Sequence, residues 1–253
     1  MIDLHAHVLP GIDDGPADEA GALALAAEAC AAGVRTIAAT PHLRSDFPDV
    51  QADEIAARVG ALRARFAQAG LELELVSGGE VDIVWAQRAS DDALRAVSYG
   101  GRGTDLLVET PYGELPPVFE ELLFLIRARG FRILLAHPER NPSLQREPAR
   151  LGRLVDSGTL VQLTAASLTG NPRSPVARLA RALISEGRAH VIASDTHGAG
   201  SRATLDDALA ATNRAGLRWM VEEAPAAILA GAPLPAPVAP TSARVRWPWP
   251  RRT

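Results

Sequence analysis

The chain contains no lysine, because all 26 of its Lys and Arg positions are arginines. Without a lysine amine, the protein cannot form a Schiff base with a carbonyl substrate. It also cannot bridge metal ions through a carbamylated lysine. Cysteine is almost absent as well: Cys30 is the only one, which excludes a disulfide within the chain. Because Cys30 falls in an alanine-rich helical pattern, we interpret it as a small buried hydrophobe.

The sequence also lacks a basic surplus, a long apolar run and a secretory leader. The formal net charge is −4 over 253 residues, so the composition does not favour a broad surface for nucleic acid. No apolar stretch reaches the roughly 20 residues that a membrane-spanning helix needs. The first residues, MIDLHAHVLPG, lack the basic and apolar segments of a signal peptide. We therefore expect a cytoplasmic protein without membrane insertion.

Short apolar segments alternate with longer helical patterns along most of the chain. Glycines such as Gly33, Gly70 and Gly130 follow the helical segments, where helices commonly end. This alternation predicts an α/β fold with parallel strands and crossover helices, and seven repeats favour a closed barrel. The expected strands are 2–4, 36–39, 73–76, 106–108, 132–136, 160–163 and 191–193. The expected helices are 17–32, 53–69, 117–129, 148–157, 175–186 and 205–215.

The last segment of the chain differs in composition from the rest. Residues 232–253 are rich in proline and arginine, which is typical of an extended, poorly ordered tail. We therefore predict a β/α barrel catalytic domain over residues 1–231, followed by this tail. Trp247 and Trp249 stand out within it. A solvated tail that touches the barrel is favoured over a docking peptide or an oligomer contact.

Side chains that can bind metal ions follow nearly every expected strand. The first strand runs into His5 and His7, and a spacing of two places both imidazoles on one face. Parallel barrel strands bring their carboxyl ends to the same face, where barrel enzymes have their chemistry. His190 precedes its strand, so we interpret it as structural. The candidate ligands are His5, His7, Asp14, His42, Glu80, Glu109, His137, Asp195 and His197.

This ligand set has nitrogen and oxygen donors and no thiolate. Such donors suit Mn²⁺, Fe²⁺ and Zn²⁺, and the carboxylates admit Mg²⁺. The ligands are too many for one ion and suit two or three, which predicts attack on phosphorus by a metal-bridging hydroxide. Arg140 and Arg202 are expected on loops at the same face, where guanidinium groups match phosphate oxygens. Metal ions together with arginines indicate a phosphate substrate.

These motifs resemble the PHP (polymerase and histidinol phosphatase) superfamily. Within it, the chain resembles the bacterial manganese-dependent tyrosine-protein phosphatases of capsule and exopolysaccharide operons. The DDGP loop and the AHPERN segment are the most specific parts of the resemblance. The matching segments are IDLHAHVLPGIDDGP (2–16), GVRTIAATPH (33–42), SGGE (77–80), LLVETPY (106–112), GFRILLAHPERN (130–141), QLTAASLTG (162–170) and VIASDTHG (191–198).

The resemblance implies a distorted seven-stranded β/α barrel of the PHP type with a trinuclear metal site, Mn²⁺ being the first choice of metal. It implies hydrolysis of phosphotyrosine on a bacterial tyrosine autokinase that controls polysaccharide export. It also assigns roles: Asp14 would lie beside the metals, and Arg140 and Arg202 would hold the phosphate as catalytic residues. The implied metal ligands are His5, His7, His42, Glu80, Glu109, His137, Asp195 and His197.

Other functions stay open at this point. One is a phosphatase for a small metabolite such as histidinol phosphate, and another is a module that docks on a kinase without catalysis. A phosphodiesterase acting on nucleic acid is disfavoured by the acidic net charge. An amidohydrolase, which also carries an HxH pair on a barrel strand, is disfavoured by the absence of lysine.

Overall fold

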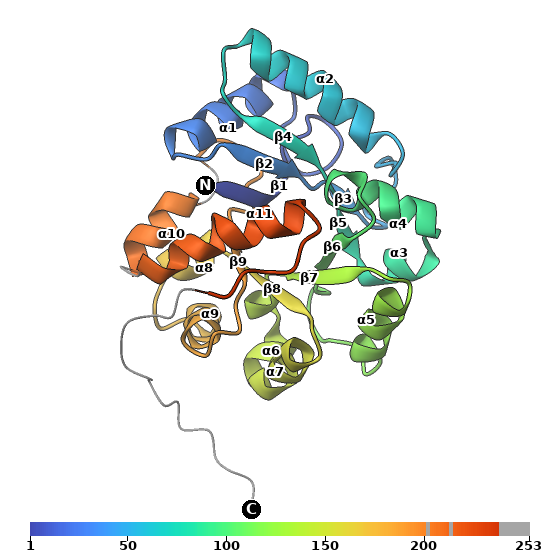
Figure 1. Ribbon diagram of the computed structural model, residues 1–253, viewed down its shortest axis with the longest axis vertical. Coiled ribbons are helices and arrows are strands. Elements are labelled where there is room, and N and C mark those ends of the chain that lie inside the picture. The colour runs from blue at the N-terminus through green and yellow to red at the C-terminus, as the bar shows by residue number, and fades with distance from the viewer. Residues whose placement is uncertain (201–202, 213–214, 238–253) are drawn as a thin grey trace, which may run out of the picture.

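The computed structural model describes residues 1–200, 203–212 and 215–237. Figure 1 shows the strands gathered around helix α11 (Glu223–Leu229), with the other helices on the outside. The described residues also form three short 3-10 turns, η1 (Tyr99–Gly101), η2 (Pro138–Arg140) and η3 (Ala215–Met220). The outer helices are α1 (Glu19–Ala31), α2 (Ile55–Gln68), α3 (Ile83–Arg88), α4 (Asp91–Val97), α5 (Phe119–Ala128), α6 (Pro142–Arg146), α7 (Pro148–Asp156), α8 (Ala165–Thr169), α9 (Pro175–Ser185) and α10 (Leu205–Thr212).

All strand pairs are parallel, as the sequence predicts for this α/β fold. One sheet has the order β1-β2-β4, and the other has the order β3-β5-β6-β7-β8-β9. The edge strand β9 lies against β1. Just after β9, Asp195 N donates to His5 O at 2.8 Å, and Thr196 forms a β-bridge with Ala6. The strands are β1 (Ile2–Ala6), β2 (Thr36–Ala39), β3 (His42–Leu43), β4 (Glu74–Ser77), β5 (Glu80–Asp82), β6 (Asp105–Glu109), β7 (Arg132–Ala136), β8 (Leu160–Thr164) and β9 (Val191–Ala193).

Two of the predicted strands, 36–39 and 73–76, are each followed by a short second strand piece that the sequence analysis did not predict. Pro41 lies between β2 and β3, where it cannot donate to a strand ladder. Gly79 lies between β4 and β5, and a Cβ there would meet Leu43 Cδ2 at 2.6 Å and Val97 Cβ at 3.0 Å, so a larger residue would force these buried side chains to shift. As a result, His42 and Glu80 do not simply follow a strand. Each begins a second strand piece, and the two are directly paired in register.

The strands separate two hydrophobic clusters, one inside and one outside. The outer cluster joins the strands to the surrounding helices, and Phe66 of α2 and Phe119 of α5 are fully buried in it. Inside, the Tyr99 hydroxyl donates to Leu4 O at 2.8 Å, which satisfies its polar atom within an apolar core. The inner cluster includes Leu4, Ala38, Leu107, Leu134, Leu160, Val191 and, from α11, Ile228. A curved sheet with apolar side chains on both faces is the arrangement expected of a β/α barrel.

The predicted helices are present, and the structure adds several short ones: α3, α4, α6, α8 and α11. These were missed because segments of five to seven residues are too short to show a helical repeat. Local capping by a side chain explains three of them, α3, α4 and α6. Asp82 accepts hydrogen bonds from the first turn of α3, and Asn141 does the same for α6, where Pro142 occupies the first position.

The C-terminal tail lies mostly beyond what the structure describes. Residues 232–237 have no regular secondary structure, and Trp247 and Trp249 lie outside the described residues. The division of the chain at residue 231 therefore stays a prediction. Over residues 1–200, 203–212 and 215–237, no helix combines the length and the apolar character needed to cross a bilayer.

Candidate metal centre

Two buried imidazoles leave the end of β1 and face each other. The Nε2 atoms of His5 and His7 lie 3.3 Å apart. At the other side of each ring, His5 Nδ1 contacts Gln162 Oε1 at 3.1 Å and His7 Nδ1 contacts Asp13 Oδ2 at 2.8 Å. Because both partners are acceptors, Nδ1 carries the proton in the neutral form of each ring, and Nε2 then presents a lone pair. Two lone pairs aimed at one point are arranged for a shared cation.

Glu80 lies at the middle of the cluster and is fully buried. Its Oε1 atom is 2.9 Å from His137 Nε2, and its Oε2 atom is 3.0 Å from His42 Nδ1. The same Oε2 lies 3.3 Å from His5 Nε2 and 3.4 Å from His7 Nε2. Strands β1, β3, β5 and β7 therefore meet at one carboxylate, which could bridge neighbouring metal ions.

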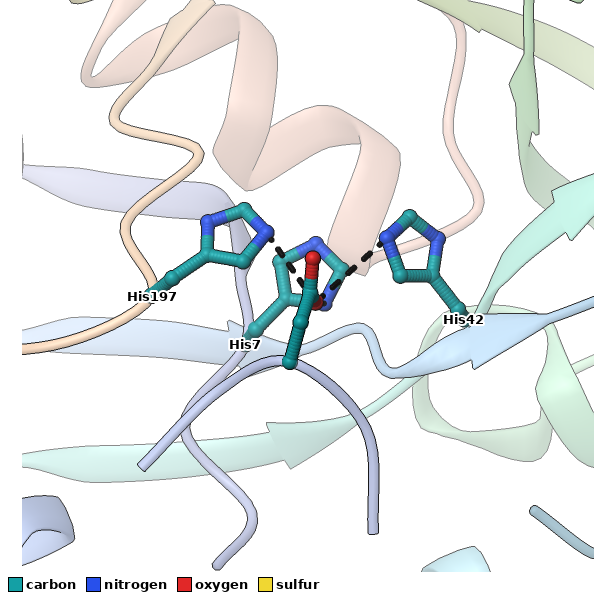
Figure 2. Close-up of side chains that lie close together, drawn as sticks. His7, His42 and His197 are labelled. Atoms are coloured by element: carbon teal, nitrogen blue, oxygen red, sulfur yellow. Dashed lines mark ion pairs between the residues drawn. The ribbon is translucent and has the colours of Figure 1, made fainter. Parts of the chain in front are cut away.

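Asp14 closes the cluster on the side that opens to solvent. Figure 2 shows the rings of His7, His42 and His197 turned toward one another. Asp14 Oδ1 lies 3.2 Å from His197 Nε2, 3.6 Å from His42 Nε2 and 3.8 Å from His7 Nδ1. Half of the Asp14 side chain is exposed, so this corner of the cluster is accessible to a substrate.

The ligand-capable atoms form four overlapping groups, in each of which all atoms lie within 4.8 Å of one another. Together these groups include every ligand expected from the sequence. The overlaps, at His5, His7, His42 and Glu80, describe adjoining positions rather than one isolated position. The groups are His7, Asp14, His42 and His197; His5, His7 and Glu80; His5, His137 and Asp195; and His42, Glu80 and Glu109.

The donor chemistry and the buried polar atoms both fit divalent metal ions. Imidazole nitrogens and carboxylate oxygens are the donors that Mn²⁺, Fe²⁺ and Zn²⁺ accept. His42 Nδ1 and Glu80 Oε2 are buried without a hydrogen bond, although they lie 3.0 Å apart. Buried polar atoms are normally satisfied, and a cation between these two would satisfy both.

Backbone strain marks the same place. Among the described residues, the non-glycine positions with positive φ are His137 at 33° and Asp195 at 53°. Such left-handed conformations cost on the order of 1 kcal/mol or more and occur preferentially at functional sites. His137 directly follows β7, and Asp195 lies just after β9. Both belong to the group that also contains His5. The strain therefore turns two ligand-capable side chains inward.

Comparison with known proteins identifies the family. Residues 1–222 match the family described as capsular polysaccharide synthesis, CpsB/CapC. The chain belongs to the CpsB/CapC family. It is 30% identical over 202 residues to the tyrosine-protein phosphatase YwqE of Bacillus subtilis, covering 80% of this chain and 79% of that protein. It is 26% identical over 216 residues to the tyrosine-protein phosphatase CpsB of Streptococcus pneumoniae, covering 80% of this chain and 85% of that protein.

The fold of this CpsB/CapC chain also matches a solved structure. That structure comes from work on YwqE from Bacillus subtilis and CpsB from Streptococcus pneumoniae, described as metal-dependent tyrosine phosphatases. The TM-score is 0.81 at 28% identity, and the match covers 94% of this chain and 100% of the other. The resemblance seen in the sequence motifs is thereby confirmed at the level of the family.

Electrostatics in the CpsB/CapC cluster favour positive charge. Burial alone would lower the pKa of His7, but its hydrogen bond to Asp13 and the nearby Glu80 outweigh burial and raise the pKa to about 10. Burial would raise the pKa of Glu80, yet His5, His137 and His42 bring it well below its ordinary value. The carboxylates thus stabilise positive charge strongly enough to keep buried imidazoles protonated. Divalent metal ions bound at the same atoms would be stabilised by the same carboxylates.

Of the two arginines predicted to bind phosphate, the structure describes Arg140 but not Arg202. Arg140, at the end of η2, places its guanidinium beside the cluster, with Nη1 2.7 Å from Asp195 Oδ2. Its side chain is 36% exposed, so the charge lies at the boundary between the ligands and solvent. Arg202 lies outside the described residues, and its role stays a prediction.

Sequence reasoning missed three residues that contact the candidate ligands. Asp13 holds His7 and also accepts from the backbone N of His42 at 3.1 Å. Gln162 of β8 accepts from His5 and from the backbone N of His137 at 3.2 Å. Arg44 Nη1 contacts both Glu109 oxygens, at 3.2 and 3.1 Å. A polar residue inside an apolar strand was the available signal for Gln162. For Asp13, its place beside Asp14 was the signal.

Proposed function

We propose that this chain is a metal-dependent protein-tyrosine phosphatase. One observation carries the proposal: four overlapping groups of imidazoles and carboxylates lie at the carboxyl ends of the strands, in a chain of the CpsB/CapC family. The relatives in Bacillus subtilis and Streptococcus pneumoniae are named tyrosine-protein phosphatases, and the matched structure is of metal-dependent ones. We take the same activity for this chain.

The cofactor we propose is a cluster of two or three divalent ions, Mn²⁺ first and Fe²⁺, Zn²⁺ or Mg²⁺ as alternatives. The overlap of the four groups supports adjoining ions, and Glu80, which belongs to two of the groups and has two carboxylate oxygens, would serve as a ligand common to them. When bound, such a cluster supplies water of lowered pKa and positive charge for the phosphoryl oxygens. The proposed ligands are His5, His7, His42, Glu80, Glu109, His137, Asp195 and His197, with Asp14 at the open side.

The remaining residues would bind and orient. Arg140 would donate to the phosphoryl oxygens, because its charge lies at the edge of the cluster and guanidinium forks match phosphate geometry. Arg202 is proposed for the same task from its position in the sequence. Gln162 and Asp13 would hold the His5 and His7 rings with Nε2 facing inward. Asp14, half exposed, would lie beside the substrate.

The finer architecture we propose is the distorted seven-stranded barrel of the PHP type. If β2 with β3 and β4 with β5 are each taken as one interrupted strand, the two sheets join. The order becomes a ring that returns to β1 through the contacts between β9 and β1. The inner apolar cluster, capped by Ile228 of α11, supports this interpretation.

The proposed substrate is phosphotyrosine on a partner protein, a bacterial tyrosine autokinase. The family's role in capsular polysaccharide synthesis and the names of the relatives support a phosphotyrosine-bearing protein. Location in the cytoplasm, expected from the sequence, stays a prediction.

The test measures phosphate release from a tyrosine-phosphorylated peptide by metal-stripped protein, with and without Mn²⁺. We expect Mn²⁺-dependent release that is lost in His5→Ala and retained in His190→Asn, a histidine outside the cluster. Arg140→Ala should lower kcat/KM about 10- to 100-fold, because a charged hydrogen bond contributes about 1.5–3 kcal/mol.

Two results would contradict the proposed function, and a third would contradict only the role of one residue. Release that does not depend on metal would remove the cofactor from it. Release from histidinol phosphate but not from the peptide, by fully metal-loaded protein, would indicate a small-metabolite phosphatase. Full kcat/KM in Arg140→Ala would remove the phosphate-binding role of that residue alone.

A further inference from the structure

Arg44 is held in place beside the metal-ligand cluster by two carboxylates. It follows β3, and its Nη1 lies 3.2 and 3.1 Å from the two oxygens of Glu109. Its Nη2 lies 2.8 Å from Asp46 Oδ2. Only 14% of the Arg44 side chain is exposed. These contacts fix the plane of the guanidinium group next to Glu109, which belongs to the group with His42 and Glu80.

Tyr112 lies on this guanidinium plane and faces solvent. The guanidinium carbon of Arg44 is 4.5 Å from the centroid of the Tyr112 ring, within the range of a cation–π interaction. The Tyr112 residue is nevertheless 64% exposed, the largest exposure among the exposed large hydrophobic residues in the described part of the chain. A large aromatic ring is thus presented to solvent one contact away from a proposed metal ligand.

The backbone on either side of Tyr112 is tied to the segment that carries Arg140. The side-chain amide of Asn141 donates to Pro111 O at 2.8 Å and to Gly113 O at 3.0 Å. Asn141 is buried and directly follows Arg140, the proposed phosphate-binding residue. The exposed ring therefore does not lie on a free loop. Asn141 fixes the backbone on both sides of it by hydrogen bonds, and Arg44 packs against one face of the ring.

Tyr112 is also a neutral surface for an anionic substrate. A tyrosine hydroxyl ordinarily loses its proton only at about pH 10. The ring therefore carries no charge near neutral pH. A phosphorylated substrate can approach it without repulsion.

We propose that the exposed ring of Tyr112, backed by Arg44, receives the aromatic ring of the phosphotyrosine and so selects aryl over alkyl phosphates. The inference rests on the phosphatase activity proposed above and adds a specificity-determining residue to it. Two aromatic rings whose centroids lie about 4.5–7 Å apart attract each other by more than the burial of their area, in offset or edge-to-face geometry. An alkyl phosphate such as phosphoserine has no ring to place there.

The experiment compares two peptides of identical flanking sequence, one with phosphotyrosine and one with phosphoserine, on Mn²⁺-loaded full-length protein. Tyr112→Ala should lower the ratio of their kcat/KM values about two- to tenfold, mainly through KM for phosphotyrosine. Tyr112→Phe should restore the wild-type ratio, because the ring remains. Phe124→Ala is the matched control, since Phe124 is another exposed aromatic residue, on α5, and it should leave the ratio unchanged.

A binding measurement keeps the inference testable without turnover. Calorimetry should show that phenylphosphonate binds the Mn²⁺-loaded protein more tightly than propylphosphonate, and that Tyr112→Ala removes this preference. Absence of peptide turnover together with an intact phenyl preference would overturn the proposed phosphatase function but not the ring site. Normal phosphotyrosine turnover with an unchanged peptide ratio and an unchanged phosphonate preference in Tyr112→Ala would overturn the ring site alone.

Discussion

Histidines at the two ends of the strands behave in opposite ways. His7, at the carboxyl end of β1, contacts Asp13 and Glu80, which raise its pKa to about 10. His190, just before β9 at the amino end, is partly buried, and burial lowers its pKa to about 4. Its Nδ1 accepts a hydrogen bond from Val161 N at 3.0 Å, which requires that nitrogen to be unprotonated.

The difference shows that neighbours, rather than the side chain or its burial, decide what a histidine does. Both rings are withdrawn from water, which by itself disfavours the charged form. At the carboxyl ends, parallel strands bring carboxylates and imidazoles together, and the grouped carboxylates stabilise positive charge. At the amino end, His190 satisfies a backbone N–H and holds β8 and β9 together. The following changes break or sharpen this comparison.

The largest effect is expected where one carboxylate serves several imidazoles. Glu80→Gln should lower kcat/KM on the order of 10³-fold or more, because loss of metal charge at the phosphoryl group is worth several kcal/mol. Bound metal, measured by elemental analysis, should fall in parallel. Glu139→Gln is the control, since Glu139 is equally buried but accepts from Thr164 N and Ser167 Oγ instead. Equal metal content in both variants would show that Glu80 is not a ligand.

A smaller effect is expected at the residue that orients His7. Asp13→Asn should weaken metal affinity about 10- to 100-fold, because a carboxylate behind a ligating histidine fixes its ring and raises its basicity. Competition with a chelator of known affinity would measure this change. Asp18→Asn, in the same N-terminal loop, caps α1 through Gly21 N and should leave the affinity unaltered, since Asn caps helices equally well. Wild-type affinity in Asp13→Asn would remove the orienting role.

The smallest effect is expected at His190, and it concerns stability rather than activity. Between its ordinary pKa of 6.5 and its folded value of about 4, the unfolded chain binds a proton that the folded chain excludes. Stability therefore falls as the pH falls through this window, by about 2 kcal/mol at about pH 5 relative to neutral pH. His190→Asn removes this dependence, because Asn does not titrate and its side-chain oxygen can accept from Val161 N.

Urea unfolding of metal-stripped wild type and His190→Asn at both pH values measures this difference. The stripped form is used because the metal cluster titrates as well. An identical loss of stability in the two proteins would mean that His190 is already exposed to protons in the folded state.

The alternation of strands and helices was readable from the sequence because long helical repeats and β-branched segments depend on local spacing. The interruptions at Pro41 and Gly79 were not readable as such. A Cβ at Gly79 would meet Leu43, a residue distant in the sequence, and no local pattern reveals that contact. The short helix α3 escaped for a different reason, since capping by Asp82 rather than periodicity defines it.

The candidate ligands were also readable, because strand ends in a parallel α/β fold converge and His5 and His7 share a face. Their supporting residues were not. Gln162 contacts His5 across a sequence separation of 157 residues, and Arg44 contacts Glu109 across 65. Polar residues of ordinary type become recognisable as part of a site only when their partners are known.

The sequence by itself determined the α/β class, the family and the set of candidate metal-binding side chains, because these depend on residue type and on spacing along one strand. Only the tertiary structure decided which ligands form common groups, which nitrogen of each ring faces inward, and that Tyr112 rests on Arg44. Those features depend on distances between separate strands, and the packing of the two hydrophobic clusters sets these distances.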